Sequence, residues 1–385
     1  MKHRIVVLGA GYAGANAAGR LARRLHPAGT EITLVNAEPD FVERVCMHQL
    51  ATGPDLRHRP LARVVAGTHV TVRTARVVAV DVTRRTVELA DGAELGYDTL
   101  VYALGSTAAE VPEHAHHLAG RPAALRLRAR LGELPAGAAV LVVGGGLTAI
   151  EAATEIAETR TDLAVAIAAR EGVGDWLSDK ARHHLRRVLD RLGVTVHEHT
   201  AVDRVDPSGV LTGTGGRLAA DLTVWTAGFA THPIAAATAL EVAADGRIVV
   251  DETMRSVSHP DVYAVGDAAL APGVGGRPLR MSCASGIPAA WQAADAIAAR
   301  LTGRKVPVTP VGYFAQCISL GRRDGIIQLV TPDDRPRSTV VTGRAAARIK
   351  EFVVAGAGWS VAHPTALMPT RRHHVAPSPA PTRTP

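Results

Sequence analysis

Residues 4–14 read RIVVLGAGYAG, a short apolar run followed by three glycines. The run RIVVL has the β-branched, uninterrupted apolar character of a buried strand. Gly9, Gly11 and Gly14 have the GxGxxG spacing, and the alanine-rich segment that follows, to about Leu25, is typical of a helix. With the strand-like EITLV at 31–35, these residues predict a complete βαβ unit.

The three glycines predict a dinucleotide site at the turn. The first permits the tight turn, the second lets backbone N–H groups approach a pyrophosphate, and the third lets helix and strand pack closely. The N-terminus of the helix adds positive potential. Asn36 ends the second strand where Asp or Glu usually holds the ribose, and its amide can also hydrogen-bond a hydroxyl.

A second unit begins at residue 139. AVLVV, the turn Gly144-x-Gly146-x-x-Ala149, a helical IEAATEIAET and a strand-like LAVAIAA follow in order. No acid stands at Ala169 to hold the 2′-hydroxyl of NADH, and Arg170 could face the 2′-phosphate of NADPH. An Arg170 that only points into solvent is the equal alternative.

A similarity between two further segments supports duplication of the βαβ unit. DTLVYALG at 98–105 resembles DLTVWTAG at 221–228, and each predicts a strand that ends in a glycine turn. VYAVGD at 262–267 is a third such ending, with no new βαβ unit before it, and should return to the first sheet. A helix from about Ile287, with Pro288 in its first turn and Ser285 or Gly286 near its cap, would aim its positive end at a bound cofactor near Asp267.

Composition excludes other classes. The chain has 385 residues, more than the ~250 to 300 at which a single core stops growing. With 47% hydrophobic and 21% charged residues it should fold. Residues 300–385 hold 13 of the 43 Lys and Arg but 4 of the 36 Asp and Glu, so the net charge of +7 belongs to the C-terminal segment. A basic segment of this kind is usually a solvated surface or an anionic-membrane contact, which argues against nucleic-acid binding.

The ordered motifs GAGYAG, LVYALGS, VVGGGLTAIEAATEIAE, TAGF and VYAVGDAA resemble the two-dinucleotide-binding-domain flavoproteins of the pyridine nucleotide-disulfide oxidoreductase superfamily, over about residues 3–300. FVERVCMHQLATG and the region after Gly321-Arg322 are similar to type II NADH dehydrogenases. The resemblance implies FAD in the first domain, NAD(P)H in the second, and electron transfer to a quinone or a similar small acceptor. It also places Glu151 near the nicotinamide and the flavin, as the catalytic candidate.

The resemblance implies an α/β fold of two Rossmann-like domains, one inserted in the other. The predicted limits are 1–118 and 229–301 for FAD binding, 119–228 for NAD(P)H binding, 302–368 for a C-terminal region with strands in 307–342 and a helix over 343–361, and a disordered tail over 369–385. The predicted cofactor-binding residues are Gly9, Gly11, Tyr12, Ala13, Gly14, Asn36, Ala103, Gly105, Gly144, Gly146, Leu147, Thr148, Arg170, Gly228, Gly266, Asp267 and Ile287.

Two departures from the family keep alternatives open. The glutamines with which type II dehydrogenases contact quinone are not evident in SCASGIPAAWQAADA, where Gln292 is displaced. Cys46 stands alone, which excludes a CxxxxC disulfide reductase but leaves a single-cysteine enzyme open; a packing role is expected for it. The alternatives are a flavoenzyme acting on a soluble metabolite or on a thiol or disulfide through Cys46, and a non-enzymatic nucleotide-sensing flavoprotein.

The predicted C-terminal helix carries an apolar stripe of Ile349, Phe352, Val353 and Gly356, flanked by Arg344, Arg348 and Lys350. Two placements are open for this stripe. It docks on the FAD domain with its cations solvated, the favoured alternative because Gly356 and Gly358 weaken a free-standing helix, or it makes peripheral contact with an anionic membrane. Three cysteines without metal spacing predict no metal site and a cytoplasmic location, on the inner face of the membrane if the contact forms. The sequence is also compatible with a homodimer.

Overall fold

The first domain is built on a parallel sheet. The computed structural model describes residues 1–53, 55–366 and 371–377. The sheet has the order β19-β7-β1-β2-β3, and its strands are β19 (Val262–Ala264), β7 (Thr99–Tyr102), β1 (His3–Leu8), β2 (Thr30–Asn36) and β3 (Val70–Thr74). The predicted return of residues 262–267 to the first sheet is therefore confirmed, because β19 pairs with β7.

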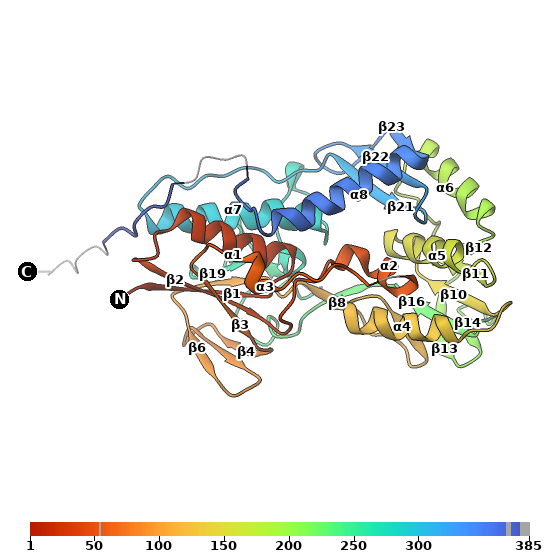
Figure 1. The fold of residues 1–385 in the computed structure, drawn as a ribbon, viewed down its shortest axis with the longest axis horizontal. Helices are drawn as coiled ribbons and strands as arrows, with labels where there is room; N and C mark the ends of the chain where they lie inside the picture. The colour runs from red at the N-terminus through yellow and green to blue at the C-terminus, as the bar shows by residue number, and fades with distance from the viewer. Residues whose placement is uncertain (54, 367–370, 378–385) are drawn as a thin grey trace, which may run out of the picture.

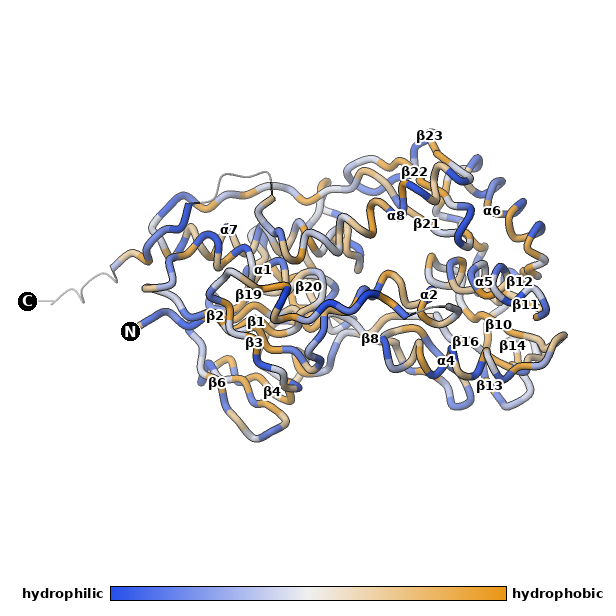
Figure 2. The backbone as a smooth tube through the Cα atoms, in the orientation of Figure 1, coloured by the Kyte–Doolittle hydropathy of each residue, from blue (hydrophilic) through white to orange (hydrophobic). Residues whose placement is uncertain are grey.

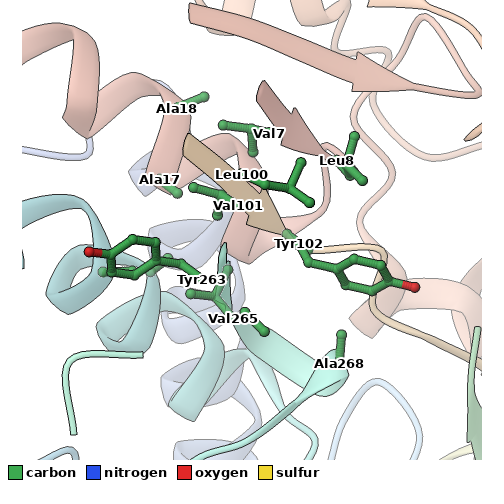
Figure 3. Packing of buried hydrophobic residues seen from close by; sticks show 14 of the residues in the cluster. Val7, Leu8, Ala17, Ala18, Leu100, Val101, Tyr102, Tyr263, Val265 and Ala268 are labelled. Carbon is green, nitrogen blue, oxygen red and sulfur yellow. The ribbon is translucent and has the colours of Figure 1, made fainter. Parts of the chain in front are cut away.

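The helix α1 (Tyr12–Arg24) packs on this sheet, and α7 (Cys283–Leu301) packs against α1. Figure 3 shows how Val7 of β1, Leu100 and Val101 of β7, and Ala17 and Ala18 of α1 lie together in the core. All five side chains are fully buried, and the small alanines let the helix approach the strands closely. In Figure 2 the strands of this core are coloured as hydrophobic.

α7 begins earlier than the sequence predicted. The extended residue Ser282 precedes it, and Pro288 is the sixth residue of the helix, not a residue of its first turn. Gly286 lies inside the helix and packs closely on the 3-10 turn η2 (Gly266–Ala268), since its Cβ position would be 3.4 Å from Cα of Gly266. The prediction was wrong because it took the proline as a start signal.

The second domain repeats the pattern. Its parallel sheet has the order β12-β11-β10-β16-β9, with β12 (Thr195–His197), β11 (Ala164–Ala168), β10 (Ala139–Val143), β16 (Leu222–Trp225) and β9 (Ala115–His117). Its helices are α4 (Arg121–Glu133), α5 (Leu147–Thr159) and α6 (Asp179–Arg191). The mixed α/β fold with two Rossmann-like units is confirmed. β9 falls inside residues 1–118 yet pairs with β16, so the second sheet begins before residue 119.

Short antiparallel elements complete the two domains. One sheet is formed by β4 (Val77–Asp81), β5 (Thr86–Leu89) and β6 (Glu94–Gly96), another by β13 (Val202–Asp206), β14 (Gly209–Thr212) and β15 (Arg217–Ala219). The chain also forms several small elements. These are the short helices α2 (Met47–Thr52) and α3 (Leu61–Val64), the paired strands β18 (Ile248–Val249) and β20 (Ala269–Leu270), and the 3-10 turns η1 (Arg44–Cys46), η2 (Gly266–Ala268) and η3 (Val274–Gly276). The chain enters and leaves the second domain through β8 (Ser106–Ala108) and β17 (Phe229–Thr231), which pair with each other.

The C-terminal region joins the two domains. It comprises the antiparallel strands β21 (Ala315–Ser319), β22 (Gly325–Val330) and β23 (Pro336–Thr342), followed by α8 (Gly343–Ser360). Strand structure starts only at Ala315, because the preceding segment contains Pro307 and Pro310, which cannot donate ladder hydrogen bonds. The predicted helix over 343–361 is confirmed. In Figure 1 α8 runs from the C-terminal sheet to the helices of the first domain.

Part of the predicted tail contacts the first domain. The backbone N–H of His26 donates to the carbonyl of His373 at 2.9 Å, and that of Ala376 donates to the carbonyl of Leu301 at 2.8 Å. The other residues predicted to be disordered, 369–370 and 378–385, lie outside the described residues.

Candidate functional site

The first glycine turn has the geometry of a nucleotide cradle. Gly9 has a φ of +90°, and a Cβ there would collide with the carbonyl of Ala103, the residue after β7. A Cβ on Gly14 would collide with the Gly9 carbonyl, so the third glycine lets α1 sit against the turn. No described atom lies within 4 Å of the Cβ position of Gly11, so the backbone there is open to a ligand.

The N-terminus of α1 is free to bind an anion. Gly11 is its N-cap residue, and no described side chain caps the helix. Uncapped N–H groups and the positive end of the helix dipole both favour a phosphate. Of the neighbouring predicted residues, Tyr12 is buried edge-on against Phe41, with 5.0 Å between ring centroids, and Ala13 packs toward Gly266.

Asn36 holds the turn itself. Its Oδ1 accepts a hydrogen bond from the backbone N–H of Ala10 at 2.9 Å, and its Nδ2 donates to the carbonyl of Glu38 at 2.7 Å. Both ends of the amide are therefore engaged by the backbone. The predicted contact between Asn36 and a ribose stays a prediction.

Beyond the turn, three polar side chains connect segments that are distant in the sequence. The hydroxyl of Ser106 donates to Oδ2 of Asp267 at 2.7 Å, and Nη1 of Arg44 donates to the carbonyl of Ser106 at 2.7 Å. Gly105 has a φ of +71°, and its Cβ position would be 3.5 Å from Nη1 of Arg44. This brings predicted Gly105 and Asp267 together and adds Arg44, which the sequence analysis missed. Arg44 is a single cation in a mostly apolar segment, and nothing in the local sequence indicated that it would hydrogen-bond Ser106.

The N-terminal end of α7 faces the same turn. Gly266 has a φ of +70°, and its Cβ position would be 3.0 Å from Cβ of Ala13. Ile287 is buried in the helix. The structure thus brings α1, η2 and the start of α7 together around the first turn.

The second glycine turn repeats the first. Gly144 has a φ of +136°, and a Cβ there would collide with the hydroxyl of Thr226. Gly146 is the N-cap of α5, no described side chain caps this helix, and no described atom lies within 4 Å of its Cβ position. The predicted residues Leu147 and Thr148 form the partly exposed first turn of α5, and Gly228, with a φ of +81°, follows β16.

Arg170 lies at the carboxyl end of β11. Its side chain is exposed, and no described residue forms an ion pair or a hydrogen bond with it. Ala169 before it is fully buried and leaves no acid at the strand end. A free guanidinium beside a phosphate-binding turn is suited to a further phosphate group.

Glu151 of α5 lies in a buried polar cluster between the second domain, α2 and the C-terminal region. Its Oε1 accepts hydrogen bonds from Nζ of Lys350 and, at 3.0 Å, from the backbone N–H of Ser319. Nδ1 of His48 on α2 is 3.7 Å from its Oε2. Burial lowers the pKa of Lys350 to about 7, although the adjacent carboxylate favours the charged form. Burial, together with Lys350 and Arg322, lowers the pKa of His48 to about 3, so this imidazole is neutral at pH 7.

The position of Lys350 corrects the sequence analysis. Lys350 was expected among the cations flanking an apolar stripe, but it points inward from α8 and is buried. Ala346 and Lys350 lie four residues apart on the inner face of the helix. That spacing was present in the sequence, but the partner Glu151 could be identified only from the packing of α8 on the C-terminal sheet beside α5.

The apolar stripe itself is exposed. Phe352 is 79% exposed, and Ile349, Val353 and Trp359 are also exposed. The alternative in which this stripe docks on the first domain is therefore wrong. Among the described residues no helix is long and apolar enough to cross a membrane.

The three cysteines are free and have no disulfide partner within the described chain. Burial raises the pKa of the Cys46 thiol to about 11, and burial also raises that of Cys317 to about 11. Cys283 at the start of α7 has its pKa raised by burial and by Asp267. Thiols with raised pKa values are poor nucleophiles near neutral pH.

Comparisons with known proteins agree with this geometry. Residues 3–298 match the family described as pyridine nucleotide-disulphide oxidoreductase. An NADH dehydrogenase-like protein of Mycobacterium tuberculosis (strain CDC 1551 / Oshkosh) is 32% identical over 83% of this chain and 86% of the relative. A type II NADH:quinone oxidoreductase of Mycobacterium tuberculosis (strain H37Rv), NdhA, is 28% identical over 71% of this chain and 68% of the relative.

Solved structures share the fold. The sulfide:quinone oxidoreductase of Aquifex aeolicus superposes with a TM-score of 0.79 at 19% identity, covering 94% of this chain and 92% of the other. NDH2 of Plasmodium falciparum superposes with a TM-score of 0.79 at 13% identity, covering 94% of this chain and 97% of the other. The chain belongs to the pyridine nucleotide-disulphide oxidoreductase family, whose members are NAD(P)H-dependent flavin oxidoreductases.

Proposed function

We propose that this protein is an FAD-dependent NAD(P)H dehydrogenase that passes electrons to a quinone. The observation that carries the proposal is the pair of matched glycine turns. Gly11 and Gly146 are both open to a ligand at uncapped helix N-termini, and the second helix leads directly to buried Glu151. Two nucleotide sites in one chain, one of them on the helix that carries a buried acid, suit hydride transfer between two cofactors.

The first domain would hold FAD. The turn at Gly9–Gly14 would receive the pyrophosphate, and Asp267 with Ser106 would face the hydroxyls of the ribityl chain. Arg44 brings a positive charge to the same region, and the dipole of α7 would favour negative charge on the ring system. FAD bound here would take a hydride from NAD(P)H and release two electrons to the acceptor.

The second domain would hold NAD(P)H at Gly144–Ala149. We assign Arg170 to the 2′-phosphate of NADPH, because it is exposed and no described residue pairs with it. Glu151 would lie next to the reacting groups and hold or release a proton, since Lys350, whose pKa burial lowers to about 7, is hydrogen-bonded to it. We also propose that residues 1–118 and 229–301 bind FAD, that residues 119–228 bind NAD(P)H, and that the other predicted cofactor-binding residues contact these two nucleotides.

A quinone acceptor is supported by the relatives' names and by α8. The exposed stripe of Ile349, Phe352, Val353 and Trp359 lies on a helix that begins with the exposed cations Arg344 and Arg348. An apolar stripe next to cations suits the surface of an anionic membrane, where lipid quinones are found. Peripheral contact would bring the junction of the domains near the quinone.

A reaction through Cys46 is the weaker candidate. The thiol is buried, and its pKa of about 11 leaves almost no thiolate at pH 7. Cys46→Ser should therefore keep most of the quinone reductase activity. Loss of turnover with disulfides alone, while quinone turnover persists, would favour the thiol enzyme.

The proposed function is tested by steady-state oxidation of NADH and NADPH with quinones, disulfides and oxygen as acceptors. We expect a yellow protein that releases FAD on denaturation and turns over fastest with quinones. A protein that binds both nucleotides but turns over none of these acceptors would be a nucleotide-sensing flavoprotein instead.

A further inference from the structure

Four polar side chains on one face of α5 bind the end of β21 and the loop that follows it, three through backbone N–H groups and one through a side chain. Glu151 accepts from the N–H of Ser319, the hydroxyl of Thr154 accepts from that of Gly321, and Glu158 accepts from that of Arg322. The fourth, Glu155, accepts from the guanidinium of Arg322 through its Oε1. The face therefore combines a structural role with three carboxyl groups in one row.

The three carboxyl groups lead from the surface to the buried cluster. Glu151, Glu155 and Glu158 are spaced four and three residues apart, so that neighbours lie on the same side of the helix with ~5 to 6 Å between Cβ atoms. Glu158 is partly exposed, whereas the side chain of Glu155 is 0% exposed and that of Glu151 is 6% exposed. At this spacing one water molecule can bridge each pair of carboxyl groups.

Two buried polar atoms in this region have no partner among the described residues. They are Oε2 of Glu155 and Nε2 of His48. A buried polar atom without a hydrogen bond costs free energy, so such atoms in a native fold call for a water or a proton. Arg322 satisfies only one oxygen of Glu155, which means that anchoring the loop does not explain the second oxygen.

We infer that Glu158 and Glu155 carry protons from solvent to Glu151 while the protein reduces quinone. The inference rests on the proposed function, because it needs a quinone as the acceptor. In the overall reaction NAD(P)H, one proton and a quinone give NAD(P)⁺ and a quinol. The nicotinamide C–H bond breaks and supplies a hydride, that is two electrons and one proton. Two O–H bonds form on the quinol, so the second proton must come from solvent.

The charges around Glu155 fit this role. Burial raises its pKa, and Arg322 opposes the shift. A carboxyl group whose pKa lies nearer to neutral pH can both accept and release a proton there. The other charged or titratable groups at this junction are Glu158 on the same helix, His48 on α2 and Lys350 on α8.

The test compares two acceptors in Glu155→Gln. Glutamine can still accept the hydrogen bond from Arg322, but it cannot carry a proton. A water-soluble benzoquinone takes up protons when it is reduced, whereas ferricyanide takes up electrons only. We expect benzoquinone turnover to fall about tenfold or more, and ferricyanide turnover to stay within about twofold of wild type.

Three further variants sharpen the comparison. Glu155→Asp keeps a titratable group and should recover part of the benzoquinone turnover. Glu158→Gln, at the partly exposed end, should also slow benzoquinone selectively and serves if Glu155→Gln does not fold. Glu133→Gln, an exposed position on α4, should change neither rate.

A readout independent of turnover is the infrared spectrum of the unreacted protein. A carboxyl C=O band that titrates above the range of a free glutamate should be present in wild type and missing in Glu155→Gln. Equal loss with both acceptors, or unchanged benzoquinone turnover in the variant, would overturn the proton route alone. Wild-type protein that reduces ferricyanide but no quinone would overturn the proposed function, and this inference with it.

Discussion

Lys350 and Glu151 are 199 positions apart in the sequence, and their side chains form an ion pair buried between α8 and α5. α8 is the last helix of the described residues, while α5 is the first helix of the second nucleotide unit and follows β10. The C-terminal helix is therefore tied by charge to the acid that we place next to the reacting groups. Any change in α8 that moves Lys350 also changes the charge around Glu151.

Breaking this pair from one side should destabilise the fold. Lys350→Met leaves a buried carboxylate without its cation, and removing one partner of a buried pair costs about 3–5 kcal/mol. The double variant Lys350→Met/Glu151→Gln removes both charges and should unfold at a higher urea concentration than the single variant. Urea unfolding followed by circular dichroism measures both. A single variant as stable as wild type would mean that the pair contributes nothing to the fold.

His48 should make the fold sensitive to acid. Its pKa is lowered to about 3 in the folded state, by burial and by Lys350 and Arg322, against 6.5 for a free histidine. The unfolded chain therefore binds one more proton between these values, and stability falls as pH falls from 6.5 toward 3. The loss is on the order of 1.4 kcal/mol per pH unit.

Replacing this histidine should remove the loss. In His48→Gln the decrease of Tm between pH 6.5 and pH 4.5 should be smaller than in wild type. His183→Gln, which replaces an exposed histidine on α6, is the matched control and should behave as wild type. An identical pH dependence of Tm in wild type and His48→Gln would show that His48 does not titrate as inferred.

The sequence predicted the nucleotide turns well because their information is local. The φ of +90° at Gly9 and the collision that a Cβ on Gly14 would cause are requirements of the turn itself, so the glycine spacing reports them directly. Tertiary pairings carry no such local signal. The hydrogen bonds from Arg44 to Ser106 and from Lys350 to Glu151 form only because strands and helices from distant segments pack together. The predicted start of α7 was wrong because Gly286 was taken as a residue near the helix cap. Its small size is instead required by the close contact with Gly266, which the local sequence around Pro288 does not report.

Gly11 should be essential for flavin binding. Its Cβ position is open, and the proposed pyrophosphate would fill that space. Gly11→Val should therefore yield mainly apoprotein, measured as flavin absorbance per chain after purification. Gly132→Val on α4 adds the same side chain at another open position and should keep its flavin. Normal flavin content in Gly11→Val would place the cofactor elsewhere.

Arg170 should set the preference between coenzymes. If Arg170 binds the 2′-phosphate, Arg170→Ala loses a charged hydrogen bond worth about 1.5–3 kcal/mol. The activation free energy that corresponds to kcat/KM for NADPH should rise by the same amount, so kcat/KM for NADPH should fall. NADH lacks the phosphate, so its kcat/KM should not change. Arg126→Ala, an exposed arginine on α4, is the control. Equal effects of Arg170→Ala on NADH and NADPH would remove Arg170 from the coenzyme site.

The last prediction concerns the exposed face of α8. Phe352→Ser removes its most exposed large apolar side chain, and Arg344→Gln/Arg348→Gln removes two cations that should each contribute ~1 kcal/mol at an anionic surface. Both variants should sediment less with phosphatidylglycerol vesicles than wild type. Added salt should weaken the binding of wild type, because charges are screened over a Debye length of ~10 Å at 0.1 M. Substitutions are preferable to truncation before Gly343, since truncation would also remove Lys350 from Glu151.

A matched control distinguishes vesicle binding through α8 from nonspecific binding through any exposed apolar side chain. Phe229→Ser removes another exposed phenylalanine, on β17, and should bind vesicles as wild type does. Flavin absorbance and Tm should be unchanged in the α8 variants, because the replaced side chains point into solvent. If wild type does not bind anionic vesicles even at low salt, or if Phe352→Ser and Phe229→Ser bind equally well, α8 is not a membrane contact. The quinone would then have to reach the junction of the domains from solution.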